Sequence, residues 1–138
     1  MVYKVPPRPT SNRVYVWRKL KKTGALLWHD AVWILPSADR TKEHFQWLAA
    51  EIVELGGEAQ VWEAHAAWIG QEDFLIRKFR EQSDDAYRAI LERLQAPDAD
   101  RVQLANAYVH AKRTDYFQSE LGEQVRNLLE QSRDGEDG

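Results

Sequence analysis

Residues 25–36 read ALLWHDAVWILP, and this stretch decides the fold of the N-terminal half. Two runs of apolar residues that favour strands, 25–28 and 31–35, flank the dipeptide His29-Asp30, and Pro36 closes the second run. Short apolar runs bounded by turn residues and a proline are typical of strands. We therefore expect an antiparallel hairpin with a two-residue turn.

A two-residue turn would place Trp28 opposite Ala31 and Leu26 opposite Trp33. Alternate side chains of a strand point to opposite faces. The aliphatic face would then hold Leu27, Val32 and Ile34, and the Trp-rich face would hold Leu26, Trp28, Trp33 and Leu35. A bare aromatic face of that size is unusual on a soluble monomer. We expect the C-terminal helices or a second subunit to cover Trp28, Trp33 and Trp62.

Helical periodicity precedes the hairpin. A helix is predicted from about Arg13 to Thr23, with Ser11 or Asn12 as its cap and Gly24 as its stop. Its apolar stripe would comprise Val14, Val16, Trp17 and Leu20, whereas Tyr15, Arg18, Lys19 and Lys22 would lie on the opposite face.

A second helix is predicted after the hairpin. Asp39 or Thr41 would cap it, and Gly56-Gly57 would end it. Its stripe would comprise Phe45, Leu48, Ala49, Ile52 and Leu55. Trp47 falls away from this stripe, which favours an interface role.

Short strands at Val2–Val5 and at about 58–64 complete the order strand, helix, strand, strand, helix, strand. That order is typical of the split βαβ, ferredoxin-like α+β fold. The rest of the chain is predicted to be helical, with a break at 96–98 and a turn at 115–117. We expect one domain over residues 1–132, made of a core at 1–68 and a helical extension at 70–132. A disordered tail is expected at 133–138.

Charge is distributed unevenly along the chain. The net charge is −3, yet the first 24 residues contain seven cations and no acid, leaving 12 cations and 22 acids for the remainder. The cations are Lys4, Arg8, Arg13, Arg18, Lys19, Lys21 and Lys22. Such asymmetry indicates an anionic partner for the basic end.

Composition narrows the chemistry. The chain has no cysteine, which excludes disulfides, cysteine zinc sites and thiol redox chemistry. The four histidines show no metal-ligand spacing, and we expect neither a metal nor a cofactor. No apolar stretch is long enough to span a bilayer, and no signal peptide is evident, so a cytoplasmic protein without membrane contact is expected.

Several segments match a known family in order and spacing. They are YKVP at 3–6, RVYVWRKLK at 13–21, GAL at 24–26, AVWILP at 31–36, LAAEI at 48–52, LGGEA at 55–59 and DYF at 115–117. Together they resemble the N-terminal domain of ChrB-type chromate-resistance regulators, over roughly residues 2–129. Part of the pattern also resembles the ferredoxin-like module of PaaX-type repressors. The resemblance implies a split βαβ fold, often a homodimer, and chromate-responsive control of transcription. Many relatives continue into a second domain, which we do not expect within these 138 residues.

The resemblance and the charge together suggest a regulatory module rather than an enzyme. The anticipated partners are DNA and chromate, with chromate as an effector, and a second copy of the chain. The expected DNA- or oxyanion-binding residues are Arg8, Arg13, Arg18, Lys19, Lys21 and Lys22, and the expected interface residues are Trp28, Trp33, Trp47 and Trp62.

Other functions stay open at this point. The alternatives are a chromate-detoxification enzyme assisted by a cofactor, and a non-enzymatic subunit that pairs with a separate ChrB C-terminal-type chain. Nucleases of the related CRISPR fold hold a metal through an Asp at the end of the first strand. The corresponding Tyr3-Lys4-Val5 contains no carboxylate, so nuclease activity is not expected.

Overall fold

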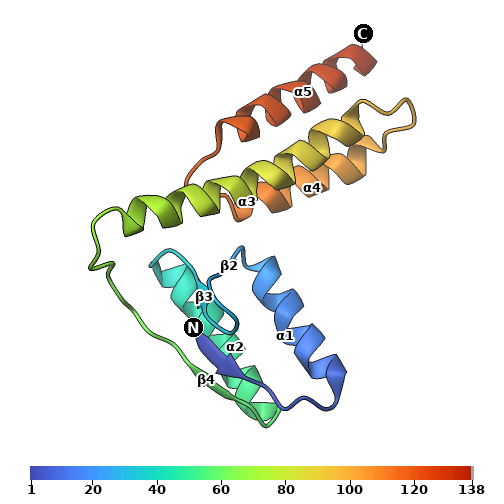
Figure 1. Ribbon diagram of the computed structural model, residues 1–138. Helices are drawn as coiled ribbons and strands as arrows, with labels where there is room; N and C mark the ends of the chain where they lie inside the picture. The colour runs from blue at the N-terminus through green and yellow to red at the C-terminus, as the bar shows by residue number, and fades with distance from the viewer. Residues whose placement is uncertain (138) are drawn as a thin grey trace. The chain divides into compact units, whose positions relative to one another are not determined.

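The computed structural model describes the backbone of residues 1–137 and the side chains of residues 1–131. The chain forms two compact units, Met1–Ala67 and Trp68–Gly138 (Figure 1). The first unit contains all the strands assigned in the described part of the chain, and the second is built from helices.

The N-terminal unit has the expected element order. Its elements are β1 (Val2–Lys4), α1 (Thr10–Lys22), β2 (Leu26–Leu27), β3 (Trp33–Ile34), α2 (Asp39–Glu54) and β4 (Glu58–Gln60). β1 pairs with β4 and β2 pairs with β3, both antiparallel. The predicted strands were longer, but their number and sequence of appearance are confirmed.

A bridge joins the two strand pairs. Val2 pairs with Val32 in antiparallel fashion, and the backbones of Met1 and Trp33 exchange hydrogen bonds of 2.7 and 2.9 Å. The strands therefore run side by side in the order β4, β1, β3, β2. The alternation of strands and helices confirms the ferredoxin-like α+β arrangement.

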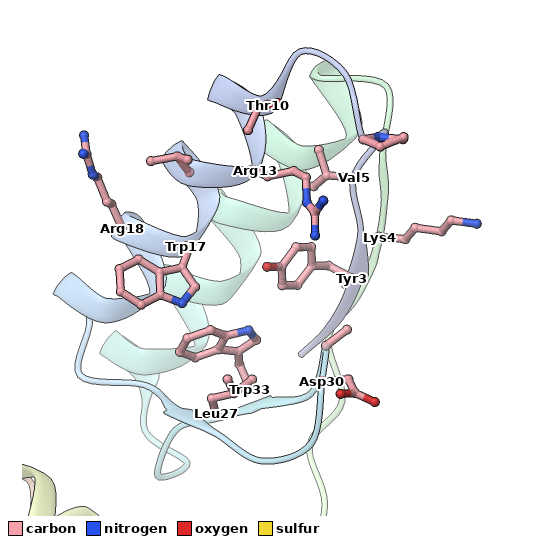
Figure 2. Close-up of a pocket in the computed structure, with 13 residues that line it drawn as sticks. Tyr3, Lys4, Val5, Thr10, Arg13, Trp17, Arg18, Leu27, Asp30 and Trp33 are labelled. Atoms are coloured by element: carbon pink, nitrogen blue, oxygen red, sulfur yellow. The ribbon is translucent and has the colours of Figure 1, made fainter.

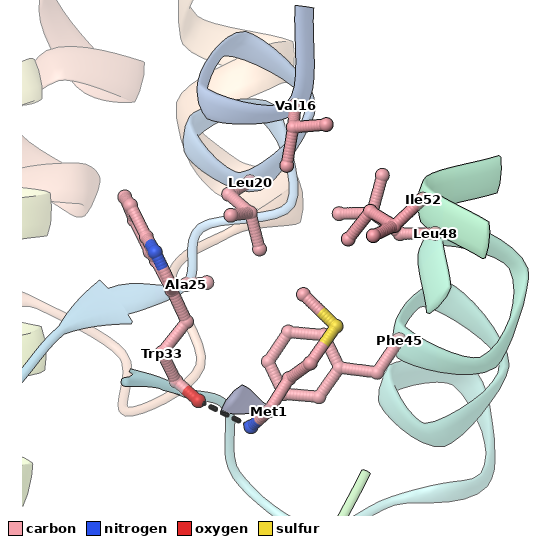
Figure 3. Close-up of a cluster of buried hydrophobic side chains, with 8 residues drawn as sticks. All are labelled: Met1, Val16, Leu20, Ala25, Trp33, Phe45, Leu48 and Ile52. Atoms are coloured by element: carbon pink, nitrogen blue, oxygen red, sulfur yellow. Dashed lines mark hydrogen bonds between the residues drawn. The ribbon is translucent and has the colours of Figure 1, made fainter. Parts of the chain in front are cut away.

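The core of this unit lies between the strands and both helices (Figure 3). Its fully buried side chains are Met1, Val16, Leu20, Ala25, Trp33, Phe45, Leu48 and Ile52. The members from α1 are four residues apart, and those from α2 are spaced by three and four, so each helix buries one stripe. The expected stripe of α2 is confirmed, whereas that of α1 is narrower than expected. Val14 and Trp17 are 40% and 48% exposed.

The helix starts differ from the prediction. α1 begins at Thr10, directly after Pro9, so Ser11 and Asn12 lie inside the first turn and do not cap it. Proline fixes its own φ and lacks an N–H, which suits a helix start. α2 begins after Ala38, whose N–H donates to the Thr41 hydroxyl at 3.0 Å. Thr41 thus supports the helix start from within it.

The hairpin register predicted above is wrong by one residue. Leu26 pairs with Ile34 and Leu27 pairs with Trp33, which leaves three residues between Trp28 and Val32. The backbone at His29 and Asp30 adopts left-handed φ values of 37° and 42°. Asp tolerates this region better than most residues with a Cβ, and the sequence lacks the Asn-Gly signal that would set a two-residue turn.

A shift of one residue regroups the side chains on the two faces. Leu27 now shares a face with Trp33, and Trp28 shares the other face with Val32. Trp33 is 1% exposed and belongs to the core. The expected face that combines Trp28 and Trp33 therefore does not exist.

The C-terminal unit consists of three helices in mutual contact, α3 (Gln71–Leu94), α4 (Arg101–Arg113) and α5 (Glu120–Asp137). The predicted break at 96–98 and turn at 115–117 are confirmed. Its buried cluster comprises Tyr87, Ile90, Leu104, Ala111 and Val125.

The buried stripe of α4 follows Leu104 and Ala111, whereas Val102 and Val109 are 73% and 47% exposed. The backbone of α5 continues to Asp137, into the segment expected as a tail. The remainder of the predicted tail, Gly138 and the side chains from residue 132 onward, lies outside the described residues.

Candidate functional site

A cleft of about 970 Å³ opens on the N-terminal unit. β1, the loop that follows it, α1 and the β2–β3 hairpin form its walls. The lining residues are Tyr3, Lys4, Val5, Pro7, Thr10, Arg13, Val14, Trp17, Arg18, Leu27, Asp30, Ala31 and Trp33 (Figure 2). The lining thus combines apolar surface with three cations, three aromatic rings and one acid.

The three cations of the cleft lie at different depths. Figure 2 shows the guanidinium of Arg13 directed inward, above the ring of Tyr3. The side chains of Lys4 and Arg18 extend away from the interior. Arg13 is therefore placed to meet a ligand inside the cleft, whereas Lys4 and Arg18 are placed to meet a larger anion that lies across its rim.

Two indole rings form one wall. Trp17 and Trp33 lie next to each other, with their ring nitrogens toward the cleft interior (Figure 2). The ammonium of Lys21 lies 5.4 Å from the ring centroid of Trp17 and 6.0 Å from that of Trp33, within the range of cation–π attraction. Lys21 thus holds a positive charge beside this wall.

The Nε1 atom of Trp33 is buried and has no hydrogen-bond partner. A buried donor without an acceptor costs about 1–3 kcal/mol relative to a satisfied one. This is the one side-chain polar atom in the described part of the chain that is both buried and unpartnered.

None of the seven N-terminal cations makes an ion pair with a described residue. The ion pairs found there involve other cations, in Lys42–Glu63, Lys78–Glu81 and Arg88–Asp85. Among the described residues, the acids thus leave the charge of the basic segment without an ion-pair partner. An unpaired cluster of this kind attracts mobile anions and polyanions.

Lys19 occupies a second, smaller pocket between α1 and α2. This pocket of about 320 Å³ is lined by Lys19, Thr23, Glu43, His44, Trp47, Leu48 and Glu51. The Lys19 ammonium lies 5.5 Å from the ring centroid of Tyr15, and the Tyr15 hydroxyl donates a short hydrogen bond to Glu51. That hydrogen bond raises the pKa of the Tyr15 phenol. Lys19 therefore faces an acidic helix as well as solvent.

The six cations predicted as a binding set thus separate into groups. Arg13 and Arg18 line the cleft, Lys21 lies beside its indole wall, and Lys19 faces α2. Arg8 and Lys22 are exposed before and at the end of α1.

The four tryptophans predicted at an interface are placed differently. Trp47 and Trp62 are 75% and 69% exposed, and Trp28 is partly buried with its ring edge against His29. Trp33 belongs to the core of its unit and lines the cleft, so it does not lie on a face that a partner protein could cover. The location of Trp47 away from the helix stripe is confirmed.

The prediction missed Tyr3, Trp17 and Asp30 as cleft residues. Periodicity assigned Trp17 to the core stripe of its helix, because a helical wheel cannot say how wide the buried stripe is. Asp30 was assigned to a surface turn, and only the three-dimensional placement of that turn brings it to the cleft. The sequence offered one signal for a cleft lined by aromatic residues, namely the aromatic residues that lie within or next to the basic segment.

The described residues contain no group of three or more His, Cys, Asp or Glu side chains placed to hold a metal ion. No helix among them is both long enough and apolar enough to cross a bilayer.

Comparison with known proteins gives one match. The family model for the N-terminal part of protein ChrB matches residues 13–128, which is most of the chain. No curated protein and no solved structure matches the sequence.

Proposed function

The chain belongs to the ChrB N-terminal domain family, a family of chromate-resistance-related regulatory proteins, and on that premise we propose that it binds DNA through the basic segment at residues 4–22. The observation that supports this proposal is the set of seven cations without an acid among them and without an ion pair to any described residue. DNA phosphates are the polyanion that such a set suits best.

The attraction of DNA phosphate to α1 depends on the charge of the basic segment more than on the net negative charge of the chain. Screening limits the reach of exposed charges to about 8 Å at physiological ionic strength. A phosphate that approaches α1 therefore experiences chiefly the cations of that helix, which contains no acid. The net charge of −3 lowers unspecific attraction to nucleic acid without removing the local site.

The outward-facing cations would contact the DNA backbone. Arg18 and Lys22 are four residues apart on exposed α1, and Arg8 is exposed in the loop before it. Arginine offers a planar fork of donors that matches a phosphate, and lysine acts as a mobile point charge. Such contacts would supply affinity and orientation rather than sequence discrimination.

Chromate is the proposed effector, because it is an oxyanion like phosphate and would compete for the same donors. A homodimer is the proposed assembly, since two copies would present two basic helices to one duplex. Trp47 and Trp62, exposed on this unit, are the proposed interface residues.

Fluorescence anisotropy with a labelled duplex from the upstream region of the protein's own operon tests the proposal. The variant Arg18→Ala/Lys22→Ala should lose most of the binding. Lys112→Ala/Arg126→Ala serves as the control, since it removes the same charge from exposed positions of the C-terminal unit. Equal loss in both variants would mean that net charge, not the basic segment, governs binding. No loss in the first variant would remove the proposed contact residues.

A second candidate function has its own observation. Trp68 and Ile69, adjacent at the start of the C-terminal unit, are 79% and 98% exposed. Exposed aromatic and aliphatic side chains of this kind mark protein contacts. We propose as the alternative that the chain is a non-enzymatic subunit for a separate ChrB C-terminal-type chain. Co-expression followed by affinity purification would test it, with Trp68→Ser/Ile69→Ser expected to abolish recovery of the partner.

A further inference from the structure

The starting point is the indole N–H of Trp33. The Trp33 side chain is 1% exposed, lines the cleft and has no acceptor for its donor among the described residues. The neighbouring Trp17 indole and the Arg13 guanidinium add further donors directed at the same space (Figure 2). Several donors that converge on one cleft predict a ligand with acceptor atoms.

The remaining walls indicate what else the ligand contains. Val5, Val14, Leu27 and Ala31 are apolar, and Trp17 is 48% exposed. A small inorganic oxyanion would satisfy the donors but gain nothing from these walls. A ligand with a flat apolar ring would use both, because such rings stack on indole faces.

We infer that the cleft binds a nucleotide, with its base stacked against Trp17, an acceptor edge of the base at the indole N–H of Trp33, and its phosphate at Arg13. This inference rests on the proposed anion-binding role of the same segment. The source of the nucleotide is either a free mononucleotide or an unpaired residue of a nucleic-acid strand, since both present the same ring and phosphate.

Asp30 at the edge of the cleft adds a preference among bases. A carboxylate accepts hydrogen bonds and repels phosphate, so Asp30 would face the base. Guanine alone among the common bases offers two adjacent N–H groups to one carboxylate while keeping a carbonyl acceptor for an indole. Guanosine monophosphate is therefore expected to bind more tightly than uridine monophosphate, and Asp30→Asn should narrow the difference.

Nuclear magnetic resonance of the ¹⁵N-labelled full chain tests the inference directly. The six tryptophans give six indole N–H signals, which single Trp→Phe variants assign. Titration with guanosine monophosphate should move the Trp33 signal downfield, as its hydrogen gains an acceptor, and should move the Trp17 signal through ring stacking. The signals of Trp47 and Trp68 serve as internal references because neither residue lines the cleft.

The outcomes separate the alternatives. Saturable shifts of Trp17 and Trp33 that Arg13→Ala weakens at least tenfold would support the inference. Equal shifts with inorganic phosphate would overturn it in favour of a bare oxyanion site. Absence of a shift at both indoles, with the mononucleotide and also with a short single-stranded oligonucleotide, would overturn it outright. Should Trp33→Phe fail to fold, assignment by exclusion from the other five variants leaves the titration intact.

A short single-stranded oligonucleotide distinguishes the two sources. Shifts with the mononucleotide indicate a free ligand, and shifts only with the oligonucleotide indicate an unpaired residue of a strand; either result supports the inference. Failure of the inferred nucleotide binding can be distinguished from failure of the proposed duplex binding. Trp17→Leu should abolish the nucleotide shifts while Arg18 and Lys22 still bind the duplex. Lys22→Ala, at a position outside the cleft lining, should weaken duplex binding while the nucleotide shifts remain.

Discussion

The hydroxyl of Tyr87 donates a hydrogen bond of 2.9 Å to the carboxylate of Asp115 inside the C-terminal unit. Tyr87 is fully buried, and Asp115 also accepts the backbone N–H of Ser119 at the start of α5. The pair therefore ties α3 to the turn that leads into α5. The Ser119 hydroxyl bonds Asp84 of α3 as a second tie.

Loss of the Tyr87 hydroxyl should destabilise the C-terminal unit. Tyr87→Phe keeps the ring but leaves a buried carboxylate with one acceptor unfilled, at a cost of about 1–3 kcal/mol in the free energy of unfolding. Tyr108→Phe, at a partly buried neighbour, is the control and should change stability by less than about 0.5 kcal/mol. Urea unfolding followed by circular dichroism measures both. Equal stability of wild type and Tyr87→Phe would contradict the structural role of the pair.

The same hydroxyl predicts alkaline sensitivity. Burial, followed by the hydrogen bond to Asp115, raises the pKa of Tyr87 well above its ordinary value. The unfolded chain loses this proton near pH 10 while the folded chain keeps it, so the contribution to stability is complete below about pH 10 and is lost as pH rises further. Above about pH 10, the difference in the free energy of unfolding between wild type and Tyr87→Phe should decrease by roughly 1.4 kcal/mol per pH unit. A difference that stays constant with pH would rule this out.

Crowding at Gly57 should make the N-terminal unit intolerant of a methyl group. A Cβ at this position would lie 2.4 Å from the Lys4 carbonyl oxygen and 2.9 Å from Ile52 Cγ2. Gly57→Ala must displace β1 from β4 or from α2, at an expected cost of about 1–3 kcal/mol or more.

Gly70→Ala is the comparison for that variant. Nothing lies within 4 Å of a Cβ at Gly70, but its φ is +83°, so left-handed strain of about 1–2 kcal/mol is the only expected cost. Thermal unfolding of both variants tests the difference. Wild-type stability in Gly57→Ala would contradict the close approach of β1 to the end of α2.

The phenol of Tyr15 should lose its proton at a higher pH than an ordinary tyrosine does. Its hydrogen bond to Glu51 raises the pKa of the phenol, and the negative charge of Glu51 acts in the same direction. Glu51→Gln removes the charge and should return the pKa of Tyr15 toward its ordinary value. Ultraviolet titration of phenolate absorbance, compared with a Tyr15→Phe variant to isolate the signal, measures the shift. An unchanged titration in Glu51→Gln would mean that α1 and α2 do not meet at this pair in solution.

Much of the fold could be predicted because periodicity and turn chemistry are local. The stripe from Phe45 to Ile52 and the stop at Gly24, where φ is 80°, follow from residue type and spacing alone. The hairpin register could not be predicted, since it depends on whether His29 and Asp30 adopt left-handed backbone angles. The sequence carries no glycine there to settle the choice.

The candidate site divides in the same way. The acid-free run of cations is a property of the sequence, and it includes Arg13 and Arg18, which line the cleft. The cleft depends on contacts between distant segments, with Tyr3 from β1, Trp17 from α1 and Asp30 from the hairpin. No local pattern assigns those residues to one surface.

The salt dependence of duplex binding tests the central claim most directly. The affinity of the unmodified chain for its upstream duplex would be measured across a series of salt concentrations, with and without chromate. If the basic segment neutralises phosphates, the logarithm of the affinity should fall linearly with the logarithm of the salt concentration, by about 0.9 per phosphate contact, and chromate should release the duplex at constant ionic strength. Absence of binding at low salt, or an affinity that does not change with salt, would contradict the account.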